Sequence, residues 1–157
     1  MSLFRVLETP LSVAEATAAV SAPNIGGIDV FLGAVRDHND GRAVTRLEYH
    51  AYVSMAEKEM QRIAEAIARE IPGVRLAALH RIGSLAVGDL AVVCAAGAAH
   101  RGEAFQACRL LIDRIKLSVP IWKREHGPDG PYWVGWEDAR CGDEHAHGHA
   151  PDHQHQQ

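Results

Sequence analysis

Residues 89–118 read DLAVVCAAGAAHRGEAFQACRLLIDRIKLS, an apolar run followed at once by a segment in which apolar side chains recur at helical spacing. The run over 89–98 predicts a strand that lies centrally in a sheet. The segment over 102–118 places its apolar side chains on one helical face and ends before a proline, which predicts a helix. Both Cys94 and Cys108 are expected to be core residues.

A second helix is predicted earlier in the chain. Ser54 followed by Glu57 matches a helix capping box, and apolar residues then recur every three or four positions until Pro72 and Gly73. Ser12 with Glu15 predicts a further short helix in the same way. Strands are expected over 4–7, 28–35, 44–52, 74–82, 121–122 and 132–134.

The strand over 28–35 reads IDVFLGAV and is expected to be largely buried. Asn39-Asp40-Gly41 supplies turn residues before the strand over 44–52, which favours a β-hairpin. The order of helices and strands predicts an α+β fold. Because 157 residues are too few for two ordinary domains, we expect one domain over residues 1–140.

Composition excludes several classes of function. The formal net charge of -4 is unlike that of a duplex-binding protein, so no nucleic acid partner is predicted. The three cysteines are far apart and form no C-x-x-C pair, which favours a reducing compartment. No apolar run reaches the roughly 20 residues that span a bilayer, so no membrane association is predicted. We expect a cytoplasmic protein.

Residues 141–157 form a tail rich in histidine, glycine, aspartate and glutamine, and we expect it to be disordered. Its alternating histidines predict weak binding of Ni, Zn or Cu. A metal-handling binding module is therefore an alternative to an enzyme. Deleting the tail separates the two, because only the metal-handling role would be lost with it.

Basic residues cluster where predicted elements end: at Arg36, at His100-Arg101, at Lys116 and at Lys123-Arg124. Converging guanidinium and ammonium groups suit an anionic substrate such as a phosphorylated small molecule. Each cluster also has a structural interpretation. Lys116 would complement the helix dipole and pair with Asp113, and Lys123 could extend over Trp122 to reach solvent.

No metal or other cofactor is predicted. His50, His80 and His100 lie on three different segments without ligand spacing. Phosphate-binding loops, dinucleotide fingerprints and nucleophile elbows are all missing from the sequence. The residues alone thus indicate an α+β domain with a cationic cleft.

Five motifs together resemble the family of molybdopterin synthase large subunits over about residues 4–136. Each motif is weak alone, but their order and spacing are specific. In sequence order they are FLGAVRDHNDG at 31–41, YVSMA at 52–56, HRIG at 80–83, AHR at 99–101 with Ala104-Phe105, and PIWKRE at 120–125.

The resemblance implies an α/β hammerhead-like fold with an additional antiparallel β subdomain. It also implies a homodimer, bound at each end by a small ubiquitin-like sulfur carrier to give a heterotetramer. The implied activity is transfer of sulfur from the carrier's C-terminal Gly-Gly thiocarboxylate to cyclic pyranopterin monophosphate. That reaction forms the dithiolene of molybdopterin in molybdenum cofactor biosynthesis.

The resemblance also implies site residues. Lys116 and Lys123 match the two essential lysines, with Lys123 expected in acid–base work and Lys116 at the carrier's terminal carboxyl. The division of roles between them stays open. The substrate-binding residues implied are Ala34, Val35, Arg36, His100, Arg101, Lys116, Lys123, Arg124 and Glu125.

Overall fold

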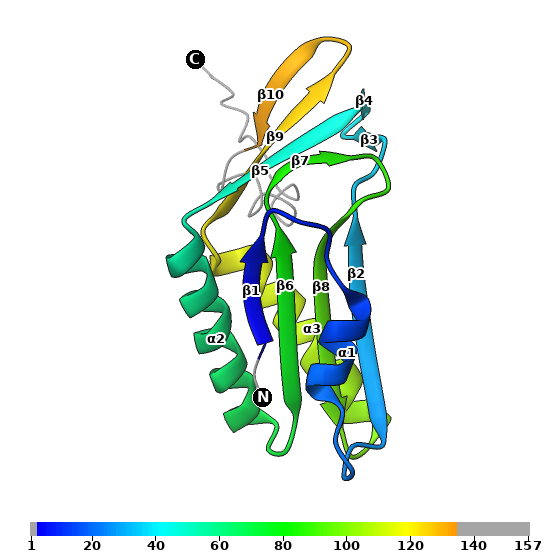
Figure 1. The fold of residues 1–157 in the computed structure, drawn as a ribbon, viewed down its shortest axis with the longest axis vertical. Helices are drawn as coiled ribbons and strands as arrows, with labels where there is room; N and C mark the ends of the chain where they lie inside the picture. The colour runs from blue at the N-terminus through cyan, green and yellow to red at the C-terminus, as the bar shows by residue number, and fades with distance from the viewer. Residues whose placement is uncertain (1–2, 135–157) are drawn as a thin grey trace, which may run out of the picture.

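The computed structural model describes residues 3–134, which form three helices and ten strands (Figure 1). The predicted domain boundary at residue 140, Cys141 and the histidine-rich tail lie outside this range. In chain order the elements are β1 Leu3–Leu7, α1 Val13–Val20, β2 Gly27–Ala34, β3 His38–Asn39, β4 Arg42–Ala43, β5 Arg46–Ala51, α2 Val53–Glu70, β6 Arg75–Arg81, β7 Gly83–Ala86, β8 Leu90–Ala98, α3 Arg101–Ser118, β9 Ile121–Gly127 and β10 Gly130–Val134.

The first sheet has the strand order β1-β6-β8-β2, with β1 parallel to β6 and the other pairs antiparallel. Side chains alternate across β6 and β8, so each strand serves two cores. Ala77, Leu79 and Val93 pack with α1 on one face. Leu76, Cys94 and their neighbours pack with α2 and α3 on the other. The prediction that β8 is central and Cys94 buried is confirmed.

The second sheet, β10-β9-β5-β7, is antiparallel throughout and lies across one end of the first (Figure 1). A separate pair, β3 and β4, turns at Asp40 and Gly41, whose φ values are +48° and +75°. Positive φ at both central residues is the geometry of a tight hairpin turn, and Gly41 adopts it without steric cost. The structure thus has the predicted α+β fold, in which the second sheet is antiparallel throughout.

Helix boundaries agree with the sequence except at α2. The Ser12 hydroxyl accepts a hydrogen bond from the Glu15 N–H at 3.1 Å, as a helix cap should. The capping box predicted at Ser54 is wrong, since α2 begins at Val53 with no side-chain cap. Glu57 instead accepts the Val6 N–H at 3.0 Å. The free edge of β1 needs a hydrogen-bond partner, and Glu57 provides it.

The strand predictions differ from the structure in four places. The predicted strands over 28–35 and 44–52 do not pair, because β2 and β5 belong to different sheets, and the hairpin between them is formed by β3 and β4. The short strand β7, which begins at Gly83, was missed, and the strand predicted over 121–122 extends to Gly127 as β9. Strand β2 is not largely buried, because it lies at the sheet edge and leaves Ile28, Phe31 and Leu32 between 37% and 45% exposed.

Close packing of α1 on β8 depends on Gly97. A Cβ at this position would lie 2.5 Å from the Val20 carbonyl oxygen and 3.0 Å from Ile25 Cγ2. We therefore expect Gly97→Ala to lower the free energy of unfolding by about 1–3 kcal/mol, measured by urea denaturation. Gly102→Ala is the matched control, because no atom lies within 4 Å there and alanine favours helix. Equal midpoints for the two variants would contradict the packing argument.

Within residues 3–134, no helix combines the length and the apolar character that crossing a membrane requires.

Candidate functional site

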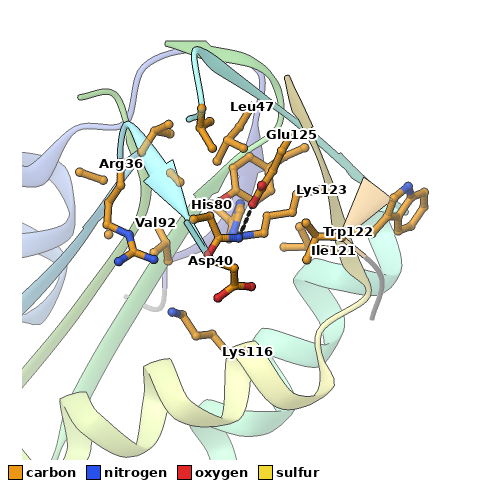
Figure 2. A pocket seen from close by; sticks show the side chains of 18 of the residues that line it. Arg36, Asp40, Leu47, His80, Val92, Lys116, Ile121, Trp122, Lys123 and Glu125 are labelled. Atoms are coloured by element: carbon orange, nitrogen blue, oxygen red, sulfur yellow. Dashed lines mark hydrogen bonds and ion pairs between the residues drawn. The ribbon is translucent and has the colours of Figure 1, made fainter. Parts of the chain in front are cut away.

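A cavity of about 700 Å³ lies between the inner face of the second sheet and the adjoining end of the first. Its wall is formed by the end of β2, the β3–β4 hairpin, the last turns of α3, and strands β5, β6 and β9. Figure 2 shows Lys116 and Lys123 reaching into this space from α3 and β9. The volume is in the range of small-molecule sites.

Strand β9 contributes Lys123 and Glu125 to the cavity, two residues apart and so on the same face. Glu125 is only 5% exposed, and its Oε1 accepts a hydrogen bond from Asn39 Nδ2 at 2.5 Å. Lys123 Nζ lies 3.6 Å from the same oxygen. The carboxylate therefore anchors the hairpin and positions the lysine ammonium, which remains one-third exposed to the cavity.

Lys116 is solvent-exposed in the last turn of α3 and lines the cavity. The pairing with Asp113 suggested by the sequence does not occur, because Asp113 instead lies 3.5 Å from Arg109, one turn earlier. Among the residues described, no carboxylate lies within 4.0 Å of the Lys116 ammonium. Its charge is thus available to an anionic ligand.

Arg36 follows β2, and the backbone leading to it is held on both sides. The Val35 N–H donates to the Asp89 carbonyl at 2.9 Å, and the Val35 carbonyl accepts the Gly88 N–H at 2.8 Å. These bonds fix the exit of the strand, so that Ala34, Val35 and Arg36 all line the cavity. A third cation faces the same space as the two lysines.

Tyr49 and His80, which the sequence did not single out as site residues, complete the wall. Their rings meet edge-on with centroids 5.1 Å apart. Burial, together with the charge of Glu125, raises the pKa of Tyr49 to about 12. Burial lowers the pKa of His80 to about 4, helped by the charge of Lys116 and opposed by a hydrogen bond to the Arg81 carbonyl. At neutral pH both side chains are therefore uncharged.

Three of the residues named from the sequence lie elsewhere. Arg124 points to the other side of β9, where its guanidinium is 5.4 Å from the Trp133 ring centroid. His100 and Arg101 begin α3 at the end opposite Lys116, about 22 Å away by the helical rise. Within one chain, the cavity gathers only Ala34, Val35, Arg36, Lys116, Lys123 and Glu125 from the predicted set.

The two described cysteines are unsuited to carry sulfur. Cys94 and Cys108 are buried, and the Cys108 thiol donates to the Cys94 carbonyl at 3.6 Å. Burial raises the pKa of both thiols, to about 12 for Cys108. A thiol in this state is a core group rather than a nucleophile.

An α+β domain whose cavity combines Arg36, Arg42, Lys116 and Lys123 with a buried carboxylate has the features of an enzyme acting on an anionic small molecule. Residues 6–118 match the sequence model described as MoaE protein. The chain belongs to this family and is a sulfurtransferase of molybdenum cofactor biosynthesis.

Individual relatives support the assignment. The chain is 50% identical over 131 residues to molybdopterin synthase catalytic subunit 1 of Mycobacterium tuberculosis, covering 83% of this chain and 89% of the relative. It is 46% identical over 123 residues to the catalytic subunit of Pyrococcus abyssi, covering 78% and 83%. The crystal structure of molybdopterin synthase from Staphylococcus aureus superposes with a TM-score of 0.83 at 37% identity, covering 86% of this chain and 98% of that one.

Proposed function

We propose that the cavity is where sulfur passes from the C-terminal thiocarboxylate of a small ubiquitin-like carrier to cyclic pyranopterin monophosphate, in the cytoplasm. The observation that carries this proposal is the convergence of Arg36, Lys116 and Lys123 on one cavity from three separate elements. A phosphate-bearing pterin needs such cations, and a carboxyl terminus needs an ammonium group near its end.

The roles follow from the surroundings of each cation. Arg36 binds the substrate phosphate, because a guanidinium offers two parallel donors to an oxyanion. Lys116, with no carboxylate partner among the described residues, contacts the carrier's terminal carboxyl. Lys123 transfers protons, because Glu125 holds its ammonium in place while leaving it open to the cavity.

In the reaction we propose, the thiocarboxylate sulfur attacks a carbon of the pterin side chain, the bond from that carbon to its oxygen breaks, and the oxygen leaves after taking a proton. Carrier and substrate are then joined through an acyl–sulfur bond. Water then attacks the acyl carbon, so that the sulfur stays on the pterin and the carrier leaves with a carboxylate. A second carrier repeats the sequence to complete the dithiolene. The protein's own part is to orient the two reactants and to move protons.

A homodimer would explain how His100 and Arg101 could belong to the site, although they lie far from the cavity within one chain. The edge strand β2, with its exposed apolar residues Ile28, Phe31 and Leu32, is a suitable surface for a second copy. A Cβ at Gly27 would lie 3.1 Å from Arg101 Cα, so the start of β2 adjoins the start of α3. If two β2 strands pair antiparallel about their centres, Gly27 of one copy lies opposite Ala34 of the other.

This arrangement brings His100 and Arg101 of the second copy next to Ala34, Val35 and Arg36 of the first. The substrate-binding set inferred from the sequence would then be complete apart from Arg124, which supports the second sheet instead. Each of the two sites would use residues from both chains, so a monomer would lack part of the phosphate-binding set.

The test is reconstitution in vitro with a thiocarboxylated carrier and cyclic pyranopterin monophosphate, followed by detection of the dithiolene product. Product that depends on both reactants is expected. Failure to form product with a carrier that binds would instead indicate a docking protein without catalysis.

A further inference from the structure

One buried polar group in the cavity has no part in the reaction described above. Among the described residues, only His80 and Glu125 are both buried and polar, at 7% and 5% exposure. Glu125 already binds Asn39 and Lys123. His80 comes from the end of β6, lines the same cavity and packs edge-on against Tyr49. Burying an imidazole is unfavourable unless its nitrogens find partners.

The hydrogen bond of His80 fixes its tautomer. Nδ1 lies 2.9 Å from the Arg81 carbonyl oxygen, which can only accept, so Nδ1 must carry the hydrogen. A neutral imidazole carries one hydrogen, and Nε2 is therefore a lone-pair acceptor. No side chain among the described residues hydrogen-bonds to Nε2, so the ring can offer this nitrogen to a ligand.

An acceptor in the wall complements the three cations on which the proposed function rests. Arg36, Lys116 and Lys123 are donors only, and they suit the anionic part of a ligand. The buried carboxylate of Glu125 already contacts Asn39 and Lys123 through Oε1. A ligand that also has N–H groups needs an acceptor in the wall. His80 Nε2 is an acceptor that a backbone hydrogen bond has oriented in advance, whereas Asp40, the carboxylate on the hairpin turn, would bring a negative charge.

We propose that His80 is a positioning residue that accepts a hydrogen bond from an N–H donor on the heterocyclic part of the substrate, while the cations hold its phosphate. This inference rests on the proposed function and deepens it. It assigns separate parts of the wall to the charged and the neutral portions of the ligand. The apolar wall residues cannot take this role, because their side chains offer no acceptor.

Two substitutions test the roles of the two ring nitrogens of His80 separately. In His80→Asn, the amide Nδ2 can replace the Nδ1–H bond to the Arg81 carbonyl, but the acceptor at the Nε2 position is lost. In His80→Gln, the side-chain oxygen reaches the position of Nε2 and restores an acceptor. We expect kcat/KM for the pterin to fall by about 10- to 100-fold in His80→Asn, mainly through KM, and by less than about fivefold in His80→Gln. The KM for the carrier should be unchanged in both.

Nitrogen NMR of the wild-type protein labelled with 15N-histidine provides a second readout, using cyclic pyranopterin monophosphate without carrier. The Nε2 signal of His80 should be that of an unprotonated ring nitrogen and should shift as the pterin is added. An unshifted signal at saturating pterin would overturn the inference. So would equal losses in both variants, which would indicate a purely structural histidine.

The outcomes also separate this inference from the proposed function. If the wild-type protein makes no product, the proposed function fails, while the NMR titration still tests the contact with His80. If product forms and His80→Asn retains full activity, the proposed function stands and the role of His80 is rejected.

Discussion

Turnover of the Lys123→Ala variant is expected to fall by about 100- to 10,000-fold, the usual contribution of a positioned acid–base group. Lys123 reaches into the cavity beside the buried carboxylate of Glu125, 3.6 Å from its Oε1. Alanine removes the ammonium but leaves Glu125 bonded to Asn39. Because the wall persists, binding of the carrier should stay within about twofold of wild type. Single-turnover assays and direct carrier titration measure the two effects.

Lys58 offers a matched control. It lies exposed on α2, away from the cavity, so Lys58→Ala removes the same charge from a different surface. We expect unchanged turnover in that variant. Lys123→Arg keeps the charge but replaces the group that exchanges protons, and it should remain strongly impaired. Normal turnover in Lys123→Ala would remove Lys123 from the mechanism.

Mixing two inactive variants is expected to restore activity. Arg101→Ala and Lys123→Ala should each be inactive or nearly so as homodimers. In a mixed dimer, one site combines both defects, and the other takes Lys123 from one chain and Arg101 from its partner, both intact. About half of wild-type activity per mixed dimer is therefore expected, if each site is built from two chains. Co-expression with two different affinity tags isolates the mixed dimer.

The control pair is Lys116→Ala with Lys123→Ala. Both lysines line one cavity within a single chain, so every site in that mixed dimer lacks one of them. No recovery is expected. A first pair that does not recover activity, or a control pair that does, would refute the proposed pairing of β2 strands.

Much of the fold could be predicted because local patterns determine it. The helical spacing of apolar residues located α2 and α3, and the uninterrupted apolar run located β8. The exposed position of β2 at the edge of its sheet could not be predicted in this way. Its apolar residues follow the pattern of a buried strand, and no pattern distinguishes cover by the same chain from cover by another. Glu57 likewise matched the pattern of a helix cap, but its carboxylate accepts a hydrogen bond from the backbone N–H of Val6 in β1, 51 residues earlier in the chain.

The site was only partly predictable for a related reason. Arg36, Lys116 and Lys123 stood out as charges at the ends of elements, which sequence can show. Tyr49 and His80 were overlooked as site residues because their importance comes from burial and mutual contact, and these depend on how β5 and β6 meet in space. His80 was considered only as a metal ligand, and its single hydrogen bond gives it a different role.

The order in which the chain leaves the ribosome has a consequence for the cavity. Strand β5 pairs with β9, about 75 residues later in the chain, and β9 carries both Lys123 and Glu125. A nascent chain that has emerged only through α3 already contains every strand of the first sheet and all three helices. It can begin to bury its core, yet it has no binding site. Competence to bind substrate therefore arises only once β9 has emerged, after most of the described framework is available to fold.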